Sequence, residues 1–121
     1  MKYCRTLQMT IFASLMLSCN KKSEIQANNC NADVSREISF NKEIMPLISR
    51  NCLQCHDSKN HYDGLVFEKY EQIASSAKSG ELYDSVISIN GYAPKMPKGG
   101  KLTDCETNLI KFWIQQGVKN N

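Results

Sequence analysis

Two cysteines and a histidine stand close together near the middle of the chain, in the order Cys52-Leu53-Gln54-Cys55-His56. Two thiols three positions apart can reach two vinyl groups on one edge of a porphyrin and bond to them as thioethers. The adjacent imidazole is then directed at the porphyrin iron, for which it is a common axial ligand. The spacing therefore predicts one covalently bound haem c, attached through Cys52 and Cys55 and ligated by His56.

A second axial ligand has to come from another part of the chain. Met96 lies in the stretch 90–101, whose prolines and glycines predict a shaped loop that can bring a thioether over the opposite haem face. Met45 is the other methionine beyond the first 18 residues, and we expect it to fill the core. His61 is the rival ligand, but it follows His56 too closely to reach across the ring. The pattern favours iron held by His56 and Met96.

The first residues have the character of an export signal. Lys2 and Arg5 precede an apolar run over residues 7–17, which is too short to span a membrane. The run ends at a small residue followed by Cys19, an order typical of the cleavage box of bacterial lipoproteins. We therefore predict a signal peptide over residues 1–18, a lipid anchor on Cys19, and a mature protein held to a bacterial membrane on its periplasmic or outer-surface side.

Four cysteines remain after the signal peptide and the anchor are set aside: Cys30, Cys52, Cys55 and Cys105. Because exported thiols tend to be oxidised, Cys30 and Cys105 are candidates for a disulfide. An alternative is a structural zinc module in which all four cysteines bind the metal, although His56 would then have no role. A thiol–disulfide oxidoreductase is a further alternative, but the βαβ pattern that accompanies such a motif is missing.

Hydrophobic periodicity places the folded domain after a polar segment. Residues 19–39 are predicted to be a polar tether, and residues 40–121 the haem domain. A helix leading into the cysteine motif is expected, with Asn41 as a candidate N-cap. Because proline is tolerated only in the first turn, Pro46 requires this helix to start near Met45 or to bend there.

Three further short helices are expected, over residues 70–77, 82–89 and 103–117, although the apolar positions of residues 82–89 fit a helix only slightly better than a strand. The last is the most clearly marked, because Thr103 followed by Glu106 forms a capping box and Gly117 is a suitable stop. Because the sequence shows no alternation of strands and helices, it predicts an all-α domain of three to five short helices.

Aromatic residues near these elements are candidates for the walls of a haem pocket. Tyr62 and Tyr92 stand in loops and could line the pocket or bond a propionate. Trp113 lies on the apolar face of the last helix, where we expect it to pack in the core beside the haem and the first helix.

At these residues the chain resembles the cytochrome c family, and in particular the small monohaem cytochrome lipoproteins of bacteria. The resemblance covers residues 40–118, and its matching motifs are Asn51-Cys52-Leu53-Gln54-Cys55-His56, Lys95-Met96-Pro97, Leu102-Thr103-Asp104-Cys105-Glu106 and Phe112-Trp113-Ile114-Gln115-Gln116-Gly117. It implies a cytochrome c-like fold and a methionine at the position of Met96 as sixth ligand. With both axial positions filled, the iron has no room for substrate, so we expect an electron carrier and not an enzyme.

Composition and charge restrict the partners. The 121 residues carry a net charge of +3, and removal of residues 1–18 leaves 13 basic against 12 acidic side chains, a net charge of +1. Such a body does not provide the basic footprint that nucleic-acid binding requires. We expect redox proteins as partners, whether this chain is a free electron carrier or a subunit through which electrons enter a larger oxidoreductase. Lys95, Lys98 and Lys101 form either a solvated loop or a basic rim that attracts an acidic partner.

Overall fold

A computed structural model describes residues 32–33 and 35–121 of the chain. This part is all-α and contains no strand, as the sequence predicts. Four α-helices follow one another with two short helical turns, and their bounds are η2 (Phe40–Ile44, a π-helical turn), α1 (Met45–Asn51), η3 (Tyr62–Gly64, a 3-10 turn), α2 (Tyr70–Lys78), α3 (Glu81–Val86) and α4 (Asp104–Gln115). None of the helices described is long and apolar enough to cross a lipid bilayer.

The segment before the cysteine motif changes from the π-helical turn η2 to the α-helix α1 next to Pro46. Pro46 lies in the first turn of α1, where its missing N–H and fixed φ fit a helix start. The prediction that α1 begins near Met45 is confirmed, and the turn before it is the π-helical η2. The predicted cap at Asn41 is wrong. Ser39 caps η2 by accepting from the Lys42 N–H at 3.3 Å, whereas the Asn41 N–H donates to the Asn121 carbonyl at 2.9 Å.

The last helix is built as its local sequence predicts. Thr103 accepts a hydrogen bond from the Glu106 N–H at 3.2 Å, and the Glu106 carboxylate accepts from the Thr103 N–H at 2.9 Å. Both halves of the capping box are therefore formed, and α4 begins at Asp104. After α4 ends at Gln115, Gly117 adopts a φ of 95°, which favours glycine and turns the chain away from the helix.

An aromatic cluster joins the first and last elements of the domain. The Phe40 ring contacts Trp113 at a centroid distance of 5.5 Å and Tyr70 edge-on at 5.1 Å. Trp113 is fully buried, and its indole N–H donates to the Lys119 carbonyl at 2.9 Å. The Tyr70 hydroxyl donates to the Val118 carbonyl at 2.7 Å. These two hydrogen bonds hold the segment after α4 against the core. They also give the polar atoms of the two aromatic side chains the hydrogen-bond partners that they need when buried.

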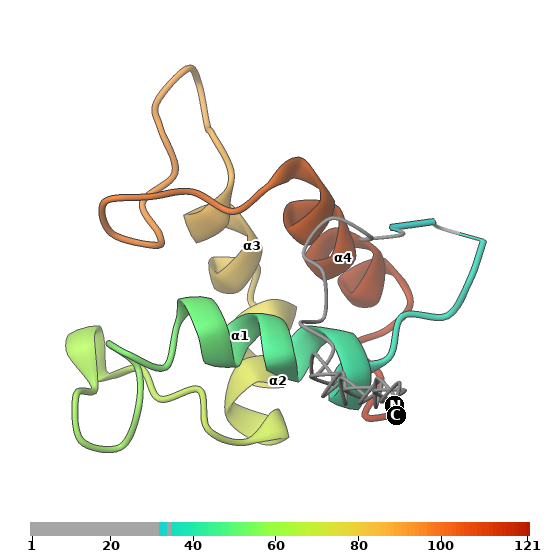
Figure 1. Ribbon diagram of the computed structural model, residues 1–121, viewed down its shortest axis with the longest axis horizontal. Helices are drawn as coiled ribbons and strands as arrows, with labels where there is room; N and C mark the ends of the chain where they lie inside the picture. Colours follow the sequence, from blue (N-terminus) through green and yellow to red (C-terminus); the bar gives the residue numbers. More distant parts are fainter. Residues whose placement is uncertain (1–31, 34) are drawn as a thin grey trace, which may run out of the picture.

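The two ends of the described chain meet at one end of the molecule. The Gln116 side chain accepts from the Ile38 N–H at 2.8 Å and donates to the Arg36 carbonyl at 2.7 Å. Ile38 is fully buried, so the core includes a residue of the segment predicted as tether. In Figure 1 this end lies on the right, while the loop after α1 and the loop between α3 and α4 lie on the left, at the far end.

Candidate functional site

A cavity of about 440 Å³ lies at the opposite end of the molecule from the two ends of the described chain. Its walls come from the loop after α1, from α3, and from the loop that leads into α4. The lining residues are Asn51, Cys52, Gln54, Cys55, His56, Tyr62, Asp63, Phe67, Val86, Met96, Pro97, Lys98 and Leu102. The volume lies in the range of small-molecule and cofactor sites, roughly 300–1,000 Å³.

The cysteine motif reaches the cavity because helical hydrogen bonding continues beyond α1. The Cys52 N–H donates to the Ile48 carbonyl at 2.8 Å, and the Cys52 carbonyl accepts from the N–H groups of Cys55 at 3.1 Å and His56 at 3.0 Å. This turn puts all three side chains of the motif on the cavity wall. Cys52 and Cys55 are free thiols.

The environment of Cys52 does not activate its sulfur. Burial raises the pKa of the Cys52 thiol to about 11, so it is protonated at neutral pH. An attacking cysteine of a thiol–disulfide oxidoreductase needs the opposite, a pKa lowered by nearby positive charge or a helix N-terminus. The surroundings of Cys52 therefore disfavour the oxidoreductase alternative.

His56 is the buried polar side chain of the cavity. It is 5% exposed, and its Nδ1 atom has no hydrogen-bond partner among the described residues. The Phe67 ring lies beside the imidazole at a centroid distance of 5.3 Å, and the Phe67 N–H donates to the His56 carbonyl at 2.7 Å. A buried polar atom without a partner costs about 1–3 kcal/mol. An imidazole kept in this state on a cavity wall is suited to hold a ligand there.

Met96 comes to the same cavity from a distant part of the sequence. Its backbone N–H donates to the Ser85 carbonyl near the end of α3 at 2.9 Å, which ties the loop to that helix. The following turn is closed by the Gly100 N–H, which donates to the Pro97 carbonyl at 3.1 Å. The structure thus brings Met96 together with the cysteine motif around one space.

The other candidates from the sequence lie outside the cavity or at its edge. His61 is exposed and does not line it, and Met45 is partly buried against the core. Tyr62 lines the cavity although it is 63% exposed, but Tyr92 is not among the lining residues. Trp113 lies in the core against Phe40, not on the cavity wall.

Sequence reasoning missed the apolar walls of the cavity. Phe67, Val86 and Leu102 are all buried, and they surround the motif with hydrocarbon. Phe67 also borders a second, more open hollow of about 310 Å³ beside α2. The sequence gives only a weak signal for Phe67, because a single aromatic residue between turn-forming residues indicates no regular element.

Two of the predicted cysteine roles involve residues that the structure does not describe. Cys105 is disulfide-bonded, while its predicted partner Cys30 and the predicted anchor Cys19 lie outside the described residues. A disulfide-bonded Cys105 cannot serve as a zinc thiolate. Among residues 32–33 and 35–121, no three His, Cys, Asp or Glu side chains gather in a way that could hold a metal ion. The disulfide at Cys105 disfavours the four-cysteine zinc module.

Comparison of the chain with protein-family models, curated proteins and solved structures finds no match.

Proposed function

We propose that this chain is an exported monohaem c-type cytochrome that carries single electrons. The observation that carries the proposal is the convergence of Cys52, Cys55, His56 and Met96 on one apolar cavity, although Met96 is far from the motif in sequence. A cytochrome c-like arrangement of the helices is part of this proposal.

The residues present fit a haem in their chemistry. The cavity provides two free thiols for thioether bonds and a buried imidazole whose Nδ1 lacks a protein partner. Apolar walls from Phe67, Val86 and Leu102 suit the faces of a porphyrin. Bound there, a haem would supply one-electron exchange between ferric and ferrous iron.

The chain's own side chains would set how that group behaves. Cys52 and Cys55 would bind the ring covalently, and His56 and Met96 would ligate its iron. A thioether ligand favours ferrous iron and so raises the reduction potential. Because His56 and Met96 would both ligate the iron, we expect no place on it for a substrate or a gas, and the protein would act as a carrier.

Export and anchoring belong to the same proposal. Covalent haem attachment takes place outside the cytoplasm, which agrees with the predicted signal peptide over residues 1–18. Lipid on Cys19 would hold the mature chain to the periplasmic or outer-surface side of a membrane.

The two histidines of the chain allow a matched test. The full chain is exported from a host that has haem-maturation machinery, and reduced-minus-oxidised absorption spectra are recorded for wild type, His56→Ala and His61→Ala. We expect sharp reduced bands in wild type and in His61→Ala, and their loss in His56→Ala. A wild-type protein that is exported and folded but shows no such bands would contradict the proposal.

A further inference from the structure

The hollow of about 310 Å³ beside α2 takes no part in the proposed electron transfer. Its volume is at the lower end of the range of small-molecule sites, roughly 300–1,000 Å³. One side of α2, the segment 64–67 and the first residue of α3 line it. We call it the α2 hollow, and its lining residues are Gly64, Leu65, Val66, Phe67, Gln72, Ser75, Ser76, Ser79 and Glu81.

The lining that α2 contributes consists of polar side chains at helical spacing. Residues 72, 75, 76 and 79 stand at positions i, i+3, i+4 and i+7, so they share one side of the helix. The Gln72 side-chain oxygen accepts from the Lys69 N–H at 2.9 Å, which leaves its NH₂ group able to donate to a ligand. Ser75 is exposed, and its hydroxyl can donate or accept.

A carboxylate is held at the end of this polar lining. Ser76 is 5% exposed, and its hydroxyl donates to Glu81 Oε2 at 3.3 Å. The Glu81 N–H donates to the Ser79 hydroxyl at 3.4 Å. The other buried residues of α2 are apolar, namely Ile73, Ala74 and Ala77. The buried hydroxyl of Ser76 therefore orients a carboxylate on an otherwise exposed residue.

The segment 64–67 contributes the apolar part of the lining. The Leu65 N–H donates to the Tyr62 carbonyl at 3.2 Å, and the Phe67 N–H donates to the His56 carbonyl at 2.7 Å. These bonds fix the segment to the loop that follows α1. Leu65 and Val66 are half-buried and Phe67 is buried, so the hollow combines hydrocarbon with hydroxyl, amide and carboxylate groups.

The charge of the lining excludes several classes of ligand. Glu81 is the one charged residue among the lining residues, which include no Lys, Arg or His. An anion would be repelled by Glu81 and would meet no positive charge. A calcium ion takes about 6–8 oxygen ligands, usually with several carboxylates among them, and the hollow offers one carboxylate. A neutral molecule that carries hydroxyl groups fits best.

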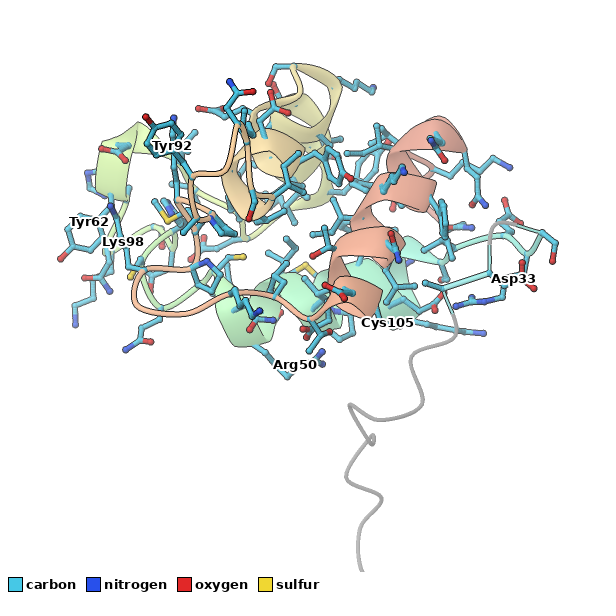
Figure 2. All side chains as sticks on the ribbon, turned by 90° about the horizontal axis from the view of Figure 1, so that it is seen from above. Asp33, Arg50, Tyr62, Tyr92, Lys98 and Cys105 are labelled. Atoms are coloured by element: carbon cyan, nitrogen blue, oxygen red, sulfur yellow. The ribbon has the colours of Figure 1, made fainter. Side chains whose placement is uncertain are left out.

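One edge of the α2 hollow lies away from the end where the described chain begins. Gly64 on this edge follows Tyr62 by two residues, and Figure 2 shows Tyr62 at the opposite end of the molecule from Asp33. Attachment to a membrane through the N-terminus would therefore leave this edge accessible to solutes.

From these observations we propose that the α2 hollow binds one neutral pyranose ring, either of a free hexose or of the end unit of a glycan. Neighbouring ring hydroxyls donate to the Glu81 carboxylate and accept from Ser75 and Gln72. The C–H groups on one face of the ring pack against Leu65 and Val66. The inference goes beyond the proposed electron transfer and does not depend on it, because the two sites share only Phe67 among their lining residues.

A chemical-shift titration of the exported, isotope-labelled full chain with glucose, galactose and N-acetylglucosamine tests the site. We expect saturable binding of at least one of these sugars with a dissociation constant on the order of 1 mM, because a single ring makes few contacts. The amide signals of Val66 and Ser75 should move, and the indole N–H signal of Trp113 in the core should stay in place. The absence of saturable shifts at Val66 and Ser75 with all three sugars would overturn the proposal.

Two glutamates allow a matched pair of variants. Glu81→Gln keeps the size of the side chain and should weaken binding about tenfold, because a hydrogen bond to a charged group is lost. Glu71 is exposed on the same helix and does not line the hollow, so Glu71→Gln should bind as wild type does. Ser75→Leu fills the hollow from an exposed position and should abolish binding. Equal affinities of Glu81→Gln and wild type, or normal binding by Ser75→Leu, would refute the assignment.

Competing ligands test the chemistry of the occupant. Glucuronate should bind wild type more weakly than glucose, and this difference should disappear in Glu81→Gln; equal binding of the two sugars to wild type would place Glu81 away from the ring. Calcium that binds at Val66 and Ser75 more tightly than the sugars would overturn the choice of a neutral ligand. Maltotriose that binds as tightly as glucose supports the end unit of a glycan, and its exclusion supports a free hexose.

The absorbance of the same preparation reports haem separately from sugar binding. Haem without sugar binding therefore refutes this inference alone, whereas sugar binding without haem refutes the electron-carrier proposal alone.

Discussion

Phe67 separates the cavity beside His56 from the second hollow, and it offers a test of how the site is closed. Its side chain is 5% exposed and borders both spaces, of about 440 and 310 Å³. Truncation in Phe67→Ala would remove the ring that packs against the imidazole and connect the two hollows. Because the hollow beside α2 is open and partly lined by serine side chains, water would gain access to His56.

The expected magnitude follows from burial. Removal of a buried phenylalanine side chain costs about 3–5 kcal/mol, which is a large share of the stability of a small domain. Phe67→Leu keeps most of the apolar contact and should cost about 1 kcal/mol. The leucine variant therefore remains measurable if the alanine variant unfolds.

Two assays on the exported protein read this change. Denaturant unfolding should give midpoints in the order wild type, Phe67→Leu, Phe67→Ala. Redox titration should give a lower reduction potential in Phe67→Ala, because water around a haem stabilises the more highly charged ferric state. An alanine variant with the wild-type unfolding midpoint and potential would show that Phe67 does not close the site.

Two further predictions concern Met96 and the ion pair between Arg36 and Glu43. Met96→Ala should convert the ferric spectrum from low-spin to high-spin and lower the potential, whereas Met45→Ala should keep the low-spin spectrum; identical spectra for the two variants would exclude Met96 as a ligand. Arg36 donates to the Glu43 carboxylate at 2.6 and 2.9 Å, and this hydrogen bonding lowers the pKa of Glu43 from its ordinary 4.5. A lowered pKa stabilises the folded protein above about pH 4.5, and the stabilisation is lost as pH falls through the folded-state pKa. Glu43→Gln should therefore cost about 0.5–1 kcal/mol at pH 7 and flatten the fall of the unfolding free energy below pH 4.5, and an unchanged acid profile would contradict this.

Local signals in the sequence are sufficient to predict where a helix begins when a capping box or a proline marks its first turn. The capping box of Thr103 and Glu106 involves side chains within one turn, and Pro46 restricts its own backbone. In contrast, Ser39 and Asn41 are both suitable N-cap residues, and the pattern alone does not decide between them. In the structure Ser39 accepts the cap hydrogen bond from the Lys42 N–H, and the Asn41 N–H donates to the Asn121 carbonyl at the other end of the domain. Such a pairing depends on the folded arrangement.

The same distinction applies to the site. The motif from Cys52 to His56 is contiguous, and its pattern alone indicates its chemistry. The approach of Met96 depends on the Ser85 carbonyl near the end of α3, and the choice of Phe67 as a wall depends on where its loop lies. Neither contact has a local pattern. Tyr92 lies outside the cavity for a local reason, because the turn at Asn90 and Gly91 holds it at the tip of the loop between α3 and α4.

Intact-mass analysis of the mature exported protein, followed by peptide mapping, tests the central claim most directly. The account predicts a mass increase of a single haem, localised to the peptide that contains Cys52 and Cys55, and its absence from a Cys52→Ala, Cys55→Ala double variant. A mature, exported wild-type chain from a haem-maturing host that carries no porphyrin on this peptide would contradict it.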